Sequence, residues 1–210
     1  MLRTDIKLYY ASIDHDLLLD RLARFMDDRR VLNLITQYLK RSAERGGLFW
    51  HYEAGISLGC PLSPVIGAFF LRELDLELQR LGLFFVRFMD DVLVLSPTRS
   101  KLRRAVKKLN RTLAALKLEK HPEKTFIGRI DKGFDFLGYH FAPGSPSDKV
   151  WDTDVGWTGF TPVTLTVARS TVAAFIERAR RLYEQEPGDG TRLGAYARRW
   201  VGWAGGGLRG

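Results

Sequence analysis

The chain has 210 residues, of which 45% are apolar and 27% charged, and this composition is that of a globular protein with one or two domains. Its formal net charge of +9 favours a polyanionic partner, because clustered Lys and Arg gain affinity by releasing counterions from phosphates. No apolar run nears the roughly 18 residues that span a bilayer, and the single Cys60 excludes an internal disulfide, so we expect a cytoplasmic protein without membrane contact.

The first half of the chain alternates apolar-rich segments with turns. Short apolar and aromatic runs predict strands, and apolar residues at helical spacing predict helices. In chain order these are a strand at 4–10, helices at 17–26 and 31–40, a short strand at 48–52 and a helix at 65–78. Gly46 and Gly47 mark a turn before the short strand, and Pro61 or Pro64 can open the last helix.

The region from 83 to 95 predicts a β-hairpin. Two β-prone runs, 83–88 and 92–95, are separated by Met89, Asp90 and Asp91, which is the pattern of two strands joined by a tight turn. The two aspartates are therefore expected at the tip of the hairpin.

A strongly basic segment follows the hairpin. Between Arg99 and Lys124 stand ten Lys and Arg residues against two Glu residues. Apolar residues at 102, 106, 109, 113 and 116 have helical spacing, so one face of a helix is buried and another is basic. The basic face comprises Arg99, Arg103, Lys107 and Arg111. Such a face is either merely solvated or a surface that binds phosphates.

The remaining chain predicts a second hairpin and a helical tail. Strand-like runs at 125–130 and 134–141 flank the turn sequence Asp131-Lys132-Gly133. A turn-rich linker at 143–166 then precedes a helical segment at 167–210. The whole pattern predicts an α+β fold with a small antiparallel sheet backed by helices.

Three aspartates stand where metal-dependent nucleotidyl transfer would need them. That reaction uses carboxylates that hold two divalent ions about 4 Å apart. Asp5, in the first predicted strand, and Asp90 and Asp91, in a hairpin turn, would meet if the two strands are neighbours. Aspartates are also common at strand ends and in turns for structural reasons, so the combination carries the argument.

The tetrapeptide F-M-D-D occurs twice, at 25–28 and at 88–91. The first copy follows a predicted amphipathic helix and has no strand pattern around it. Catalytic carboxylates must be placed rigidly, so we interpret Asp27 and Asp28 as solvated residues at a helix end.

The ordered motifs resemble those of bacterial reverse transcriptases of the group II intron and retron type. The resemblance rests on D-I-K-L-Y-Y-A-S-I-D-H at 5–15, G-I-S-L-G-C-P-L-S-P at 55–64, F-M-D-D at 88–91, E-K-T at 123–125 and F-L-G-Y at 136–139. It implies a polymerase palm at 1–142, the linker at 143–166 and a partial helical thumb-like segment at 167–210.

The resemblance also implies roles for the acidic and basic residues. Asp5 and Asp90 would be the principal ligands of two Mg²⁺ ions, with Mn²⁺ as an alternative, Asp91 a supporting carboxylate and the Ile6 carbonyl a further oxygen ligand. Lys124 would protonate the departing pyrophosphate, although a surface lysine is an equally ordinary interpretation.

Further implied residues would bind the nucleotide and the nucleic acid. Tyr10 would pack under the deoxynucleotide sugar and clash with a ribose 2′ hydroxyl, while Leu58, Gly59 and Pro61 would line the nucleotide pocket. The RNA template and DNA primer would be held by the basic helix face and by a primer-gripping hairpin of Phe136, Leu137, Gly138 and Tyr139. The oligomeric state is left open.

Two features depart from the family pattern. Many relatives have Gln where this chain has Leu58, and Leu cannot donate or accept the hydrogen bonds of that amide. Met1 lies four residues before Asp5, so we expect the fingers segment to be missing and synthesis by the chain alone to be weak or absent.

Two other classes of function are compatible with parts of the pattern. A non-catalytic RNA-binding module of the maturase type would use the basic residues but has no need of three costly carboxylates. A palm-like nucleotide cyclase would use the carboxylates but not the L-S-P, E-K-T and F-L-G-Y motifs. The leading hypothesis is therefore an RNA-directed DNA polymerase palm.

Overall fold

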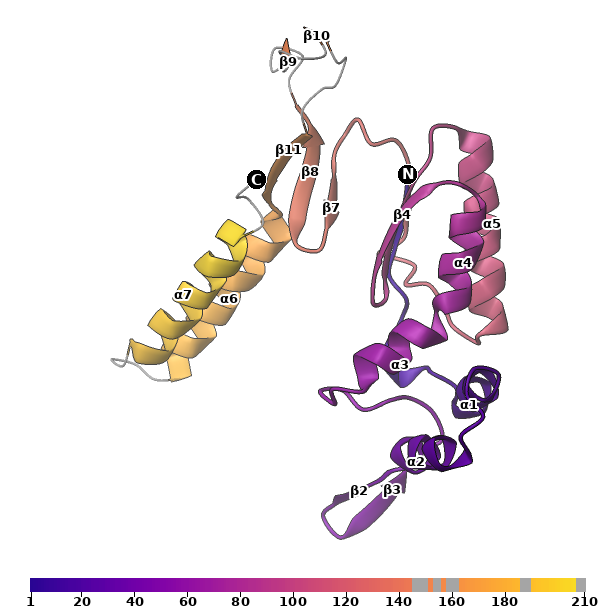
Figure 1. Cartoon of the computed structure of the whole chain (residues 1–210). Helices are drawn as coiled ribbons and strands as arrows, with labels where there is room; N and C mark the ends of the chain where they lie inside the picture. Colours follow the sequence, from indigo (N-terminus) through magenta and orange to yellow (C-terminus); the bar gives the residue numbers. More distant parts are fainter. Residues whose placement is uncertain (145–150, 153–155, 158–162, 186–189, 207–210) are drawn as a thin grey trace. The chain divides into compact units, whose positions relative to one another are not determined.

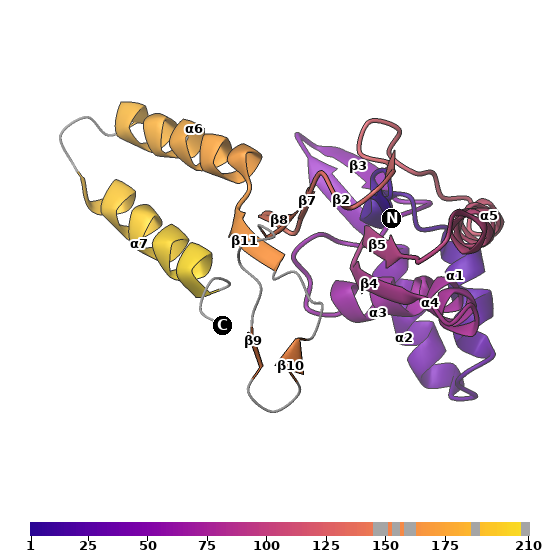
Figure 2. The same cartoon turned by 90° about the horizontal axis from the view of Figure 1, so that it is seen from above.

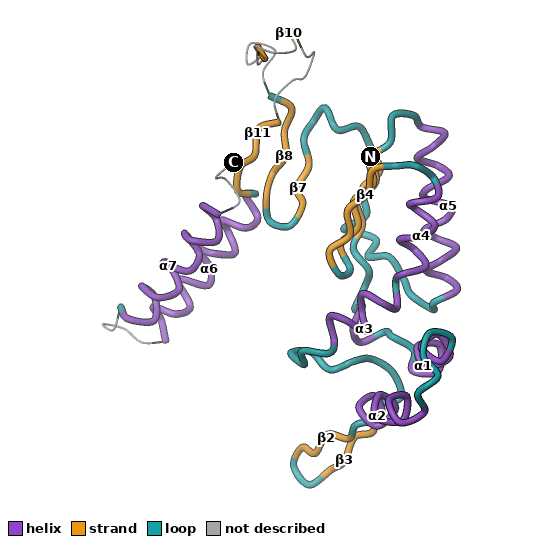
Figure 3. Tube along the Cα trace, viewed as in Figure 1, coloured by secondary structure: helices purple, strands orange, loops and turns teal. Residues whose placement is uncertain are grey.

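The computed structural model describes residues 1–144, 151–152, 156–157, 163–185 and 190–206. The chain divides into two compact units, Met1–Gly128 and Arg129–Gly210. Each unit combines helices with a small antiparallel sheet (Figures 1 and 3), which confirms the predicted α+β class.

A four-stranded antiparallel sheet forms the centre of the first unit. Its strands lie in the order β4 (Phe84–Phe88), β5 (Asp91–Leu95), β1 (Leu2–Thr4) and β6 (Phe126–Ile127). Thr4 is paired with Val92, and Phe88 with Asp91. The C-terminal end of β1 therefore lies at the same end of the sheet as the turn between β4 and β5.

Two amphipathic helices back this sheet. Helices α4 (Arg72–Arg80) and α5 (Arg99–Ala115) pack against each other and against β4 and β5 (Figure 2). Leu74 and Leu78 of α4 are fully buried, as is Leu109 of α5. The predicted basic helix is confirmed, because its apolar spacing turns one side into the core and leaves the other side to solvent.

Shorter elements complete the first unit. They are the 3-10 turn η1 (Tyr9–Ala11), helices α1 (His15–Ala23), α2 (Arg29–Leu39) and α3 (Ser63–Phe70), and the hairpin of β2 (Ser42–Arg45) and β3 (Leu48–His51). Asp14 and Asp28 cap α1 and α2 by accepting hydrogen bonds from backbone N–H groups. The interpretation of Asp27 and Asp28 as exposed helix-end residues is thereby confirmed.

Two predicted elements were wrong in their extent, and one strand was missed. The first strand covers residues 2–4 rather than 4–10, because its partner β5 begins at Asp91 and Tyr9 belongs to a 3-10 turn. Strand β2 was missed, because its hairpin with β3 is exposed and lacks a buried alternating face. The helix predicted at 65–78 is broken at Leu71 into α3 and α4.

The second unit contains a three-stranded sheet and two helices. Strands β11 (Val163–Val167), β8 (Tyr139–Pro143) and β7 (Phe134–Phe136) lie in that order, and helices α6 (Arg169–Gln185) and α7 (Thr191–Gly206) pack together. The short strands β9 (Trp151–Asp152) and β10 (Gly156–Trp157) form a separate pair. The ring of Trp200 in α7 stacks on the ring of Phe175 in α6, with 4.3 Å between their centroids, so this tryptophan packs between the two helices.

The predicted second hairpin was wrong in its pairing. Residues 126–127 form β6 and pair with β1, whereas β7 turns directly into β8 through Leu137 and Gly138. Both turn residues have positive φ, the conformation of a tight two-residue hairpin. Much of the predicted linker at 143–166 lies outside the described residues, and β11 overlaps its last part and extends one residue beyond it.

No helix in the described part of the chain is long and apolar enough to cross a membrane.

Candidate active site

The sheet register brings Asp5 beside the turn that carries Asp90. Asp5 directly follows β1, whose last residue is paired with Val92. The Ile6 N–H donates to the Asp90 carbonyl at 3.2 Å, and the His121 N–H donates to the Asp5 carbonyl at 2.8 Å. Main-chain hydrogen bonds therefore hold Asp5 between the hairpin turn and the E-K-T segment.

The hairpin turn has an unusual backbone. Met89 adopts a φ of 55°, in the left-handed region that residues with a side chain rarely occupy. Phe88 and Asp91 form the last pair of the ladder, so Met89 and Asp90 make the whole turn. Such conformations cost of order 1–3 kcal/mol and persist only where neighbouring contacts hold them.

Two of the three carboxyl groups, those of Asp90 and Asp91, have raised pKa values. Burial and then the charge of Asp5 raise the pKa of Asp90, and burial followed by the charges of Asp90 and Asp5 raises the pKa of Asp91. The Lys124 ammonium opposes both shifts and lies 2.8 Å from Asp5 Oδ2. The hydrogen bond to Asp5 in turn raises the pKa of Lys124, which therefore stays charged at neutral pH.

This donor set suits a hard divalent cation. Carboxylate and backbone carbonyl oxygens are the ligands that Mg²⁺ prefers. A bound cation would offset both the burial and the neighbouring negative charges that raise the pKa values of Asp90 and Asp91. Within the described ranges, no three acidic, His or Cys side chains are already grouped to hold a metal ion. Asp5 instead directs one oxygen to Lys124. The side chain of Ile6 has no donor atom and is buried in the core, so only its backbone carbonyl could contribute.

Replacing Asp91 by Asn is expected to stabilise the metal-free protein at pH 7. The folded-state pKa of Asp91 is raised, so its stabilising contribution is present when it is protonated and is lost as the pH rises through that pKa. At neutral pH the ionised group therefore opposes folding. Urea midpoints measured with a chelator should be higher for Asp91→Asn at pH 7, and the difference should shrink as the pH falls. An equal gain from Asp27→Asn, at an exposed position, would contradict the electrostatic cause.

The 55–64 loop is fastened to the segment that follows Asp5. The Gly55 N–H donates to the Ile13 carbonyl at 2.7 Å, and the Ile56 N–H donates to the Tyr10 carbonyl at 2.8 Å. Gly55 has a φ of 84°, and a Cβ there would lie 2.9 Å from the Ala11 carbonyl oxygen. Only glycine allows the two segments to approach so closely.

Of the predicted nucleotide-pocket residues, Tyr10 lies against the hairpin turn. Its hydroxyl lies 3.2 Å from the sulfur of Met89. Helix α3 comes close to the same ring, because a Cβ on Gly67 would lie 2.9 Å from Tyr10 Cε1. Leu58 is 79% exposed, and Gly59 and Pro61 are also exposed on the loop. The loop thus presents these three residues to solvent.

The predicted nucleic-acid contacts fall in both units. Arg99, Arg103, Lys107 and Arg111 are all exposed on α5. In the second unit, Phe136 is buried and Leu137 and Gly138 form the hairpin turn. The Tyr139 hydroxyl donates to the Trp203 carbonyl at 3.0 Å. A Cβ on Gly138 would lie 2.9 Å from the Trp203 ring, so glycine at this turn leaves room for a side chain of α7.

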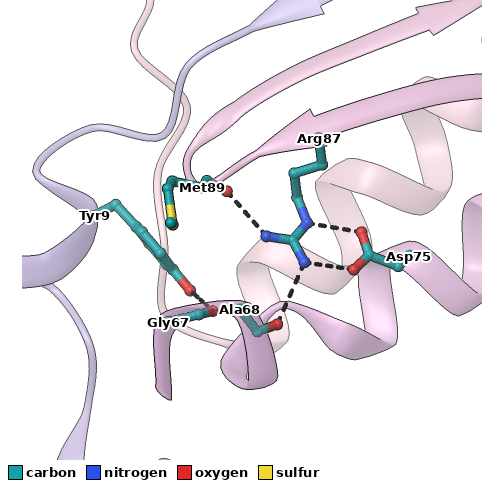
Figure 4. A network of polar contacts seen from close by, with 6 residues as sticks. All are labelled: Tyr9, Gly67, Ala68, Asp75, Arg87 and Met89. Atoms are coloured by element: carbon teal, nitrogen blue, oxygen red, sulfur yellow. Dashed lines mark hydrogen bonds and ion pairs between the residues drawn. The ribbon is translucent and has the colours of Figure 1, made fainter. Parts of the chain in front are cut away.

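The side-chain contacts around the hairpin turn were not predicted from the sequence. Arg87 in β4 bonds Asp75 on α4 and the Met89 carbonyl, and the Tyr9 hydroxyl donates to the Gly67 carbonyl (Figure 4). The available signal was a single Arg within the apolar strand F-F-V-R-F. A charged residue at such a position needs a partner, but the sequence does not show which one.

The first two thirds of the chain match a known protein family. Residues 1–141 match the family model described as "Reverse transcriptase (RNA-dependent DNA polymerase)". Among curated proteins, Protein YkfC of Escherichia coli (strain K12) is 23% identical over 170 residues, covering 64% of this chain and 45% of that protein.

Two solved structures of telomerases have a similar fold. Telomerase from Candida albicans, in complex with the TWJ fragment of telomeric RNA, has a TM-score of 0.59 and 13% identity over 80% of this chain and 30% of that chain. Apo telomerase from Candida tropicalis, truncated from its C-terminal domain, has a TM-score of 0.55 and 14% identity over 67% and 33%. This chain thus spans less than half the length of these relatives. By the family match over its first 141 residues, the chain belongs to the reverse transcriptase (RNA-dependent DNA polymerase) family.

Proposed function

We propose that the chain is the catalytic palm of an RNA-directed DNA polymerase that adds deoxynucleotides to a primer 3′ hydroxyl. The observation that carries the proposal is that Asp5, directly after β1, lies beside the hairpin turn that carries Asp90 and leads into Asp91 of β5. Membership of the reverse transcriptase family supports the same reaction. The group II intron or retron subtype stays a prediction from the motifs.

In this proposal the carboxylates hold two Mg²⁺ ions. Asp5 and Asp90 are the principal ligands, with Asp91 and the Ile6 carbonyl in support. When bound, the ions lower the pKa of the attacking hydroxyl and stabilise the leaving pyrophosphate. Lys124 remains protonated beside Asp5, and its flexible ammonium donates a proton to the pyrophosphate as it leaves.

The remaining residues bind and select the substrates. The Tyr10 ring, next to the turn that carries Asp90, packs under the sugar of the incoming deoxynucleotide. The pocket for this nucleotide is lined from the 55–64 loop by Leu58, Gly59 and Pro61. The basic face of α5 holds phosphates of the RNA template and DNA primer, and the β7–β8 turn grips the primer end.

Primer extension by the full-length protein tests this function. With an RNA template, a DNA primer, Mg²⁺ and deoxynucleotides, the product should lengthen one nucleotide at a time and should disappear when the metal is chelated. Salt-sensitive RNA binding without any synthesis would overturn the polymerase and favour a maturase-type binding module.

Replacing Tyr10 by Ala is expected to weaken selection against ribonucleotides by roughly tenfold to hundredfold, the range that a steric contact in a pocket supplies. The small side chain would leave room for a 2′ hydroxyl beside the Met89–Asp90 turn. The ratio of kcat/KM for deoxynucleotides and ribonucleotides measures the effect. Tyr10→Phe is the matched control, because it keeps the ring and loses only the hydroxyl. Equal loss of selection in both variants would show that the hydroxyl, and not the ring, discriminates.

A further inference from the structure

A partly buried ion pair, between Arg87 and Asp75, lies beside the Met89–Asp90 turn, and the proposed chemistry does not use it. Arg87 lies in β4, two residues before Met89, and only 10% of its side chain is exposed. Its Nε donates to Asp75 Oδ1 at 2.7 Å, and its Nη2 donates to Asp75 Oδ2. This two-point pairing fixes the plane of the guanidinium as well as its position.

The same guanidinium reaches the backbone of the turn. Its Nη1 donates to the Met89 carbonyl at 3.1 Å (Figure 4). That carbonyl belongs to the planar peptide group whose nitrogen is the nitrogen of Asp90. A bond that fixes the oxygen therefore fixes the plane from which Asp90 extends, in a turn whose first residue has a positive φ.

A third contact of the Arg87 guanidinium reaches α3. Arg87 Nη2 also donates to the Ala68 carbonyl at 3.3 Å, and the Tyr9 hydroxyl donates to the neighbouring Gly67 carbonyl. Both carbonyls are among the last four of α3, which lack partners inside their own helix. The break at Leu71 thus leaves acceptors for Arg87 and Tyr9.

We propose that Arg87 and Asp75 are positioning residues that orient Asp90 for metal-dependent nucleotidyl transfer. The inference rests on the proposed function. A buried ion pair is weak evidence for stability, because apolar residues of similar volume often serve as well. Apolar residues could not donate to the Met89 and Ala68 carbonyls, and Asp75 holds the guanidinium in the orientation that lets it do so.

The variant Arg87→Lys tests the proposal in the full-length protein. Lysine keeps the charge but lacks the planar fork, so it cannot pair Asp75 at two points and bond the Met89 carbonyl as well. We expect kcat for primer extension to fall by roughly tenfold to hundredfold, the cost of a small misplacement of a reacting group. The KM for the nucleotide should stay unchanged, and the Mg²⁺ concentration for half-maximal rate should rise. Asp75→Asn should shift both quantities in the same directions.

Arg80→Lys is the matched control. Arg80 lies on α4 and pairs with Glu77, but its side chain is 65% exposed. This variant should retain wild-type kcat and metal dependence. Rates are compared at a temperature at which circular dichroism shows every variant folded. A folded Arg87→Lys protein with wild-type kcat, or one whose loss matches its unfolded fraction, would overturn the proposal.

Hydrogen exchange separates this inference from the proposed function. The amides of residues 89–91 should exchange faster in Arg87→Lys than in the wild-type protein or Arg80→Lys, with β1 and α5 unchanged. Unchanged exchange at the turn would overturn the positioning role even if synthesis is seen. Absence of synthesis from the wild-type protein would instead overturn the proposed function, and the exchange result would still decide whether Arg87 holds the turn.

Discussion

Replacing Asp90 and Asp91 together by Asn is expected to lower the rate of primer extension by roughly a thousandfold. The amides keep the size of the side chains but not the charge that attracts a divalent cation. Bound metal ions contribute several kcal/mol of transition-state stabilisation, and each 1.4 kcal/mol changes a rate about tenfold. The measurement is single-nucleotide extension under saturating primer and template, with Mn²⁺ binding as an independent reading of the metal site.

The chain supplies its own control for this experiment. Asp27 and Asp28 belong to the same tetrapeptide F-M-D-D at another place in the sequence. Both are exposed, and Asp28 caps α2, a role that Asn fills about equally well. The Asp27→Asn, Asp28→Asn variant should retain wild-type synthesis and Mn²⁺ affinity. Equal activity in the two double variants would show that Asp90 and Asp91 do not belong to the catalytic centre.

Phe70→Ala is expected to destabilise the first unit by roughly 3–5 kcal/mol, the usual cost of truncating a fully buried aromatic residue. Phe70 lies in α3, is 0% exposed and belongs to the core that joins the sheet to the helices. That cost is a large part of the roughly 5–15 kcal/mol by which domains are stable. With a urea dependence of about 1–3 kcal/mol per molar, the midpoint should fall by at least about 1 M.

Val65→Ala provides the comparison within the same helix. Val65 is 65% exposed, so its truncation leaves no cavity and should move the midpoint little. The urea-induced unfolding is followed by hydrogen exchange at the amides of β5, so that the midpoint refers to the first unit. Similar midpoints for the two variants would show that Phe70 does not support the core.

Much of the candidate site could be predicted from the sequence, because the responsible signals are local. The β-prone runs on either side of Met89, Asp90 and Asp91 indicate a hairpin with its aspartates at the tip. The structure has that hairpin, with Asp90 in the turn and Asp91 as the first residue of β5. The apolar spacing of α5 indicates its buried and basic faces. The surroundings of the two F-M-D-D copies distinguish a strand turn from a helix end. Turn chemistry and periodicity act within a few residues, so they are readable without tertiary structure.

The tertiary structure decided what depends on partners distant in the sequence. Strand β1 ends at Thr4, whose partner Val92 is the second residue of β5, and β6 joins β1 rather than the following hairpin. The pairing of Lys124 with Asp5, and that of Arg87 with Asp75, join residues from different elements. A strand or a charged side chain shows in the sequence that it needs a partner, but the partner is chosen by packing and burial in the folded chain.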